Sequence, residues 1–169
     1  MPQGKVRIWR TILRFLSVGL PACALTYPAD GPVEPLTVCE IVRDLAAQEG
    51  KSVAVLGRYS FRTTGRWVGE DACEPATQTP PQLILVEDSK DGPKPPDNYS
   101  LDGAAVRRKF AAIERHTSLG KFRFGTPDYD RWAVVYGRVE ARKPDDTKKA
   151  AANLVYRGSG VVVFLTPDR

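Results

Sequence analysis

The sequence predicts a mainly β protein that closes into a small five-stranded barrel, with an N-terminal helix and a second helix between strands three and four. The predicted elements run helix, three strands, helix, two strands, which is the order of an OB-like β-barrel. A parallel α/β sheet would need a crossover helix after nearly every strand, and the sequence does not place one there. Gly57 and Gly137 lie inside predicted strands, where glycine often marks the bends that small barrels need.

The first 24 residues have the order of a secretory signal peptide. Basic residues come first, an apolar stretch follows, and small residues surround Cys23. The apolar stretch is too short to span a bilayer, which takes about 20 residues. We therefore expect an exported protein, periplasmic or membrane-tethered, with a signal peptide at 1–24 and a tether at 25–36. An amphipathic N-terminal helix of a cytosolic protein is the alternative.

The segment Leu20-Pro21-Ala22-Cys23 resembles a bacterial lipobox, in which cleavage precedes a cysteine that carries lipid. Pro21 departs from the usual residue at its place, and plain cleavage after Ala24 competes. The mature protein is therefore expected to begin at Cys23 or at Leu25. Membrane contact is expected only through the signal peptide or through lipid at Cys23.

Processing of the leader removes or modifies Cys23 and leaves two cysteines, Cys39 and Cys73. In an oxidising compartment such a pair is expected to form a disulfide. The closed loop of about 35 residues would contribute on the order of 3.5–4 kcal/mol before any strain is subtracted. Two unrelated buried thiols are the alternative.

A barrel domain is expected over residues 37–169. It opens with a helix whose first residues, Thr37 and Glu40, have the spacing of a capping box, and Gly50 is its natural end. The run 83–86 is continuously apolar, so we expect that strand to be covered on both faces. The remaining expected elements are strands at 52–62, 66–70, 132–141 and 153–166 and a helix at 101–116.

The net charge of +5 lies mostly in the leader. Four of the 25 basic residues precede Leu25 and no acidic residue does, so removing the leader leaves 21 basic against 20 acidic residues, a net charge of +1. Such a domain has no long-range attraction for nucleic acid or anionic lipid. We therefore expect no nucleic-acid partner.

Part of the chain resembles a known group of proteins. Val38-Cys39-Glu40, the short helix, the run from Gly50 to Gly57 and then Cys73 are similar to small exported bacterial proteins with an OB-like barrel. Many of those proteins are lipoproteins, and most have no assigned function. The resemblance covers residues 37–87 well and the rest only by element order. It implies an envelope location and a small barrel, and it carries no catalytic residue.

Residue types suited to catalysis or metal binding are sparse. His116 is the only histidine, and near the end of a helix we expect it to cap the helix or face solvent. The sequence has no nucleophile elbow, phosphate loop, CxxC or other metal-ligand spacing. We therefore expect neither an enzyme nor a cofactor or metal site.

One group of residues suggests binding. OB barrels bind oligomers across strands two and three, and Arg62, Arg66 and Trp67 lie on or beside the second strand. Aromatic rings beside cations can stack on a base or a sugar, although Trp67 can also belong to the core. We expect a non-catalytic binding or interaction module whose partner is an unknown envelope protein or small ligand. An oligonucleotide- or oligosaccharide-binding domain is the alternative.

Overall fold

The computed structural model describes residues 31–120, 125, 127–142, 149–158 and 162–165, and the expected signal peptide and Cys23 lie outside these residues. Along the chain the elements are β1 (Leu36–Thr37), α1 (Val38–Arg43), α2 (Leu45–Gln48), β2 (Ser52–Arg62), β3 (Gly65–Gly69), β4 (Gln82–Glu87), α3 (Gly103–Ile113), β5 (Tyr129–Ala141), β6 (Ala152–Tyr156) and β7 (Val162–Phe164).

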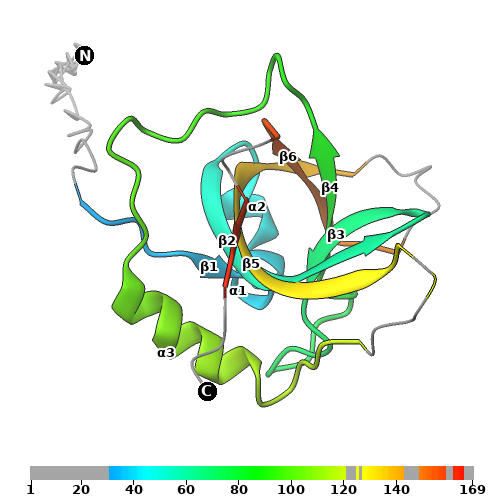
Figure 1. Cartoon of the computed structure of the whole chain (residues 1–169). Helices are drawn as coiled ribbons and strands as arrows, with labels where there is room; N and C mark the ends of the chain where they lie inside the picture. Colours follow the sequence, from blue (N-terminus) through cyan, green and yellow to red (C-terminus); the bar gives the residue numbers. More distant parts are fainter. Residues whose placement is uncertain (1–30, 121–124, 126, 143–148, 159–161, 166–169) are drawn as a thin grey trace, which may run out of the picture.

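Five strands form a closed barrel (Figure 1). β2 pairs antiparallel with β3 and β5, β3 with β4, and β5 with β6. β4 and β6 run parallel, from Leu83 opposite Ala152 to Glu87 opposite Tyr156, and this pairing closes the ring. Because α3 lies between the third and fourth barrel strands, the architecture is OB-like, and this confirms the predicted fold class.

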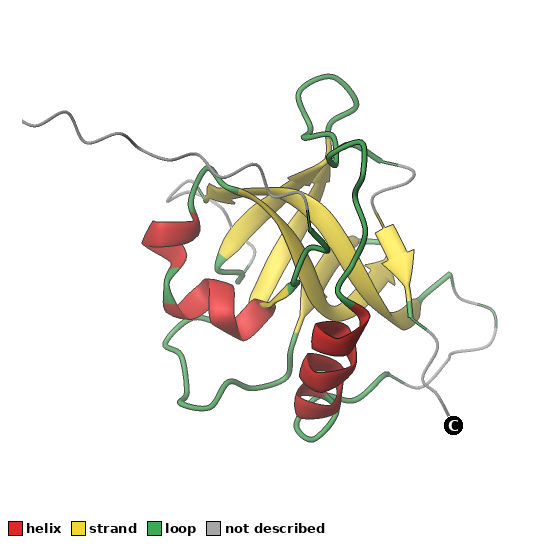
Figure 2. Cartoon of the chain, turned by 90° about the vertical axis from the view of Figure 1, so that its left-hand side faces the viewer, coloured by secondary structure: helices red, strands yellow, loops and turns green. Residues whose placement is uncertain are grey.

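The barrel is covered from outside along β2 and β5. Residues 54–56 and 132–136 are buried without a break, which indicates packing on both faces of these strands. Phe110 of α3 contacts Trp132 of β5 edge-on, with ring centroids 5.1 Å apart. Figure 2 shows α3 lying against this side of the strands. The helix between strands three and four therefore extends the core beyond the barrel interior.

The strand predicted to be covered on both faces, β4, is covered on one face only. Leu83 and Leu85 are buried, whereas Ile84 is half-buried and Val86 is 39% exposed. The helices α1 and α3 pack against β2 instead, and in Figure 1 no helix lies beside the outer side of β3 and β4. The prediction was wrong because an apolar run does not reveal which strands receive the helices.

The N-terminal helix begins as predicted. Thr37 Oγ1 accepts the Glu40 N–H at 3.1 Å, and the Glu40 carboxylate accepts the Thr37 N–H at 2.7 Å, which completes the capping box. Val38 and Ile41 are fully buried and join the core at one end of the barrel. The backbone at Asp44, with φ −129° and ψ 48°, interrupts the expected single helix and divides it into α1 and α2.

The expected last strand, 153–166, is two strands. β6 ends at Tyr156, Gly158 adopts a φ of 103°, and β7 then pairs antiparallel with β5. A φ of this value favours glycine, so the chain turns at Gly158, inside the predicted strand.

The packed domain begins earlier than residue 37. The Val33 N–H donates to the Ser100 carbonyl at 2.8 Å, and Pro35 is fully buried, so the last residues of the expected tether belong to the fold. The other limits shift modestly: α3 covers 103–113 rather than 101–116, and β5 begins at 129 rather than 132.

Two tyrosines make the fold sensitive to alkali. Burial, reinforced by Tyr129, raises the pKa of Tyr59 to about 12, and burial beside Tyr136 raises the pKa of Tyr99 to about 12. An unfolded tyrosine ionises near pH 10. Between about pH 10 and 12 the unfolded chain has therefore lost protons that the folded chain keeps, and stability falls as pH rises through this window.

We expect phenolate absorbance to show that Tyr59 and Tyr99 ionise near pH 12 while the protein is folded. The urea midpoint should fall between about pH 10 and 12, and it should fall less in Tyr59→Phe. Ionisation of all tyrosines near pH 10 in the native protein would contradict this expectation.

Candidate functional site

A row of side chains crosses the outside of the barrel. In register across neighbouring strands it consists of Asp130, Ser60, Trp67, Ile84 and Asn153. The two central residues of the row are Trp67 and Ile84. Val68, which follows Trp67 on β3, and Leu83, which precedes Ile84 on β4, are buried in the core. Because side chains alternate between the faces of a strand, Trp67 and Ile84 face outwards. Both are half-buried rather than buried, so the indole of Trp67 is accessible at the centre of the row.

Arg62 lies over this indole. Its Cζ is 5.7 Å from the Trp67 ring centroid, its Nη2 is 2.6 Å from Asp130 Oδ1, and its Nη1 donates to the Phe61 and Tyr129 carbonyls. The guanidinium is therefore fixed in position and its charge is balanced. Burial raises the pKa of Asp130, but the nearby Ser60 side chain, the Arg62 guanidinium and the Gly120 N–H outweigh this effect and lower it overall, so the carboxylate stays ionised.

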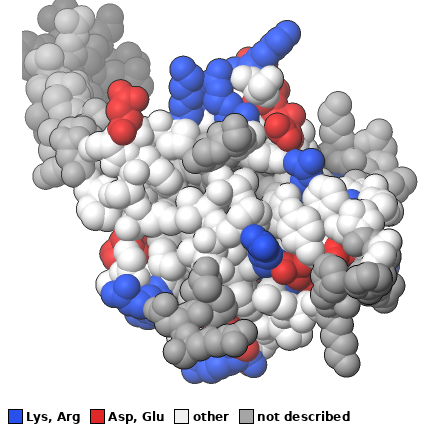
Figure 3. Space-filling model, viewed as in Figure 1, with Lys and Arg blue, Asp and Glu red and all other residues white. Residues whose placement is uncertain are grey.

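A hollow of about 330 Å³ lies beside the indole. We call the surface that includes it the Trp67 face, and it consists of Arg62, Thr64, Trp67, Gln82, Ile84 and Lys149. Its lining combines an aromatic ring, an aliphatic side chain, an amide and a cation. On the face of the molecule shown in Figure 3, acidic and basic side chains are interspersed and do not form an extended basic surface.

Arg66, the third residue predicted for binding, does not belong to the Trp67 face. Alternation places it on the opposite side of β3 from Trp67, opposite Phe61 in the strand pairing. Its Nη1 donates to the Tyr156 hydroxyl at 3.1 Å and lies 3.3 Å from Glu87 Oε2. Arg66 therefore belongs to a separate group with Tyr156 and Glu87, and the structure brings only Arg62 and Trp67 together.

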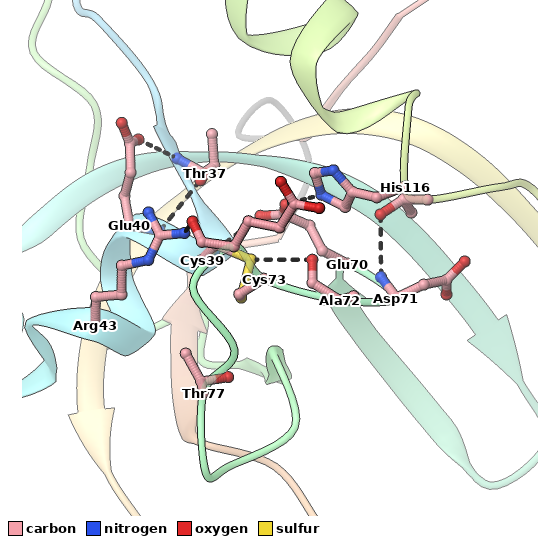
Figure 4. The surroundings of a disulfide bond; sticks show 12 residues. Thr37, Cys39, Glu40, Arg43, Glu70, Asp71, Ala72, Cys73, Thr77 and His116 are labelled. Carbon is pink, nitrogen blue, oxygen red and sulfur yellow. Dashed lines mark hydrogen bonds and ion pairs between the residues drawn. A yellow bond between two sulfur atoms is a disulfide. The ribbon is translucent and has the colours of Figure 1, made fainter.

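The predicted disulfide is present. Cys39 at the start of α1 is bonded to Cys73 after β3, with their Cα atoms 5.5 Å apart (Figure 4). Both residues are buried, at 4% and 6% exposure. The bond links α1 to the segment that follows the first hairpin, which confirms the predicted pairing.

His116 was expected to cap a helix or to face solvent, but its side chain is 26% exposed and contacts Glu70. Its Nε2 lies 2.9 Å from Glu70 Oε2, and Glu70 Oε1 accepts the Cys39 N–H at 2.8 Å (Figure 4). Glu70 is 3% exposed, so a buried carboxylate joins β3, α1 and the end of α3. These groups line a second hollow, of about 440 Å³, between α1 and α3.

Sequence reasoning missed Gln82, Ile84 and Lys149 on the Trp67 face and Glu70 beside His116. Leu83 and Ile84 are both apolar, so the sequence does not show that one is buried and the other faces outwards. This difference follows only from the uncovered outer face of β4. Glu70 had no local signal, because its partners lie 31 and 46 residues away.

Other exposed apolar side chains lie outside this face. Leu119 is 40% exposed, and Val163 and Phe164 on β7 are 39% and 43% exposed. Arg131 Cζ lies 5.3 Å from the Phe164 ring centroid, so part of this ring is shielded. Among the described residues, no helix combines the length and apolar character that crossing a bilayer requires.

Comparison of the chain with protein-family models, with curated proteins and with solved structures finds no match.

Proposed function

We propose that this chain is a non-catalytic binding module of the bacterial envelope and that it binds its ligand on the Trp67 face. One observation carries the proposal: the accessible Trp67 indole lies at the centre of a row across the barrel, with Ile84 beside it and the Arg62 guanidinium over it. OB-like barrels bind oligomers on this part of their surface. An aromatic platform with polar neighbours suits a planar or ring-shaped ligand.

The charges on the Trp67 face favour an uncharged, hydroxyl-rich ligand such as an oligosaccharide. The charge of Arg62 is balanced by Asp130, whose side chain is only 3% exposed. The guanidinium therefore offers a ligand a flat surface without a net charge. Lys149 is the other cation of the face. Without the leader, the chain carries a net charge of only +1. Nucleic-acid binding depends on neutralising several phosphates, which makes it the weaker alternative.

An exported location is part of the proposal. The leader has the residue order of a signal peptide, and the buried Cys39–Cys73 disulfide is typical of an oxidising compartment. Periplasmic release and tethering through lipid at Cys23 are the two forms that this location can take.

Tryptophan fluorescence tests the proposed site directly. Of the described residues, two are tryptophans: Trp132 is buried at 4% exposure, and Trp67 is accessible. Titration of the mature chain with soluble chito- and cello-oligosaccharides is expected to change the emission of Trp67, with saturation. Trp67→Ala should weaken binding, followed by calorimetry, by about tenfold or more, since an aromatic stacking contact is worth about 1–3 kcal/mol.

Phe164→Ala is the matched control, because it removes an exposed aromatic ring from β7 and should leave the affinity unchanged. Oligo-dT serves as the anionic comparison and is expected to bind no tighter than about 10 μM at physiological salt. Glycan binding that survives Trp67→Ala would place the site elsewhere. Salt-dependent, sub-micromolar binding of oligo-dT would favour the nucleic-acid alternative instead.

A further inference from the structure

Three metal-ligating side chains converge at the second hollow. One ligand atom each of Cys39, Glu70 and His116 can be chosen so that all three lie within 4.8 Å of one another. They come from the start of α1, the residue after β3 and the segment after α3, so only the folded barrel brings them together (Figure 4). The disulfide adds a fourth donor, Cys73, whose sulfur is bonded to that of Cys39.

The distance between the His116 and Glu70 donors is close to that of two ligands on one tetrahedral metal ion. Zinc binds nitrogen and oxygen ligands at about 2.0–2.2 Å, so two such ligands around one ion lie roughly 3.3 Å apart. His116 Nε2 and Glu70 Oε2 are already 2.9 Å apart. The other oxygen of the Glu70 carboxylate accepts the Cys39 N–H at 2.8 Å, which fixes the orientation of the carboxylate. Metal ligands in proteins are commonly oriented by such hydrogen bonds from surrounding groups.

We propose that reduction of the Cys39–Cys73 bond creates a zinc site made of Cys39, Cys73, Glu70 and His116. A dithiol supplies two electrons and two protons to the protein disulfide, and the dithiol itself becomes a disulfide. Zn²⁺ then replaces the two thiol protons, which leave to water, and binds both thiolates, the Glu70 carboxylate and His116 Nε2. Two sulfurs, one nitrogen and one oxygen form a donor set that suits zinc.

The charge around the site and its access to solvent both favour metal binding. Two thiolates and one carboxylate around Zn²⁺ leave one net negative charge. Apart from Glu70, the hollow is lined by three cations, Arg43, Lys109 and Arg115, and two anions, Glu40 and Glu74, so one net positive charge faces the site. The His116 side chain is 26% exposed, and the hollow of about 440 Å³ opens the site to solvent. The metal would link α1 to the segment after β3, as the disulfide does, so α1 would stay held against the barrel in the reduced protein.

Cobalt binding by the reduced chain tests this proposal, independently of any function of the Trp67 face. The mature protein is reduced with dithiothreitol, freed of it without air, and titrated with Co²⁺. We expect one Co²⁺ per chain, with thiolate-to-cobalt charge-transfer absorption and the strong visible bands of a tetrahedral site, and displacement by Zn²⁺. The oxidised protein should show neither signal.

Variants separate the four-ligand site from a simple pair of thiols. His116→Ala and Glu70→Gln should each weaken cobalt binding at least tenfold, and Glu74→Gln, which changes another residue of the same hollow, should not. If Glu70→Gln does not fold by circular dichroism, His116→Ala decides, because its side chain is partly exposed. Absence of binding by the reduced wild type, or binding unaffected by His116→Ala, overturns the proposal.

Discussion

The mature chain with serine in place of both Cys39 and Cys73 is expected to lose about 2–4 kcal/mol of unfolding free energy and to melt roughly 5 °C or more below the wild type. The disulfide closes the loop that contains the first hairpin, and its loss gives the unfolded chain more conformations. It also frees α1, whose Val38 and Ile41 are fully buried in the core. Urea unfolding followed by circular dichroism, without reductant, measures the loss.

Two comparisons test whether the loss of stability comes from the Cys39–Cys73 bond itself. In the chain that keeps its leader, Cys23→Ser should leave the unfolding midpoint unchanged, because Cys23 is not part of the bond. The reduced wild type in excess chelator should resemble the double serine variant. An unchanged midpoint in the double variant would mean that the bond contributes no stability.

Leu83→Ala is expected to cost about 2–5 kcal/mol, the range for removing a buried leucine side chain. Leu83 is fully buried and lies between Val68 on β3 and Ala152 on β6 in the strand pairing. Truncation leaves a cavity at the seam where the barrel closes, and the strands on either side cannot easily move inwards to fill it. Denaturant unfolding of the single variant measures the cost.

Ile84→Ala, one residue further along β4, is the matched control. It should cost less than Leu83→Ala, because Ile84 is only partly buried and lies on the Trp67 face. The same variant should weaken oligosaccharide binding, since Ile84 lies directly opposite Trp67. Equal costs for the two truncations would contradict an uncovered outer face of β4.

Short sequence patterns predicted the elements that depend only on residues close together in the chain. The capping box of Thr37 and Glu40 forms as the sequence pattern indicates, and Gly50 follows the helical segment with a φ of 76°. The cysteine pair was predictable by counting, because only two cysteines remain after residue 24. The order of the elements was then sufficient for an OB-like barrel.

Features that depend on the neighbours of a strand were not predictable. The two faces of β4 look alike in the sequence, and only the docking of α3 on β2 and β5 leaves Ile84 outside. Arg66 and Trp67 are adjacent in sequence yet face opposite sides of β3, and register had to be known to separate them. Glu70 meets His116 only through the packing of α3 near the end of β3.

The parallel pairing of β4 with β6 has a consequence for how the protein folds. Residues 83–87 have no partner on that edge until residues 152–156, about 70 residues further along the chain, pair with them. Until then the sheet is open, and an open edge is a template for pairing with other chains. Contacts between distant segments form slowly, because a long loop must first be ordered. The edge of β4 is therefore open to pairing with other chains in any state in which residues 152–156 have not yet paired with it.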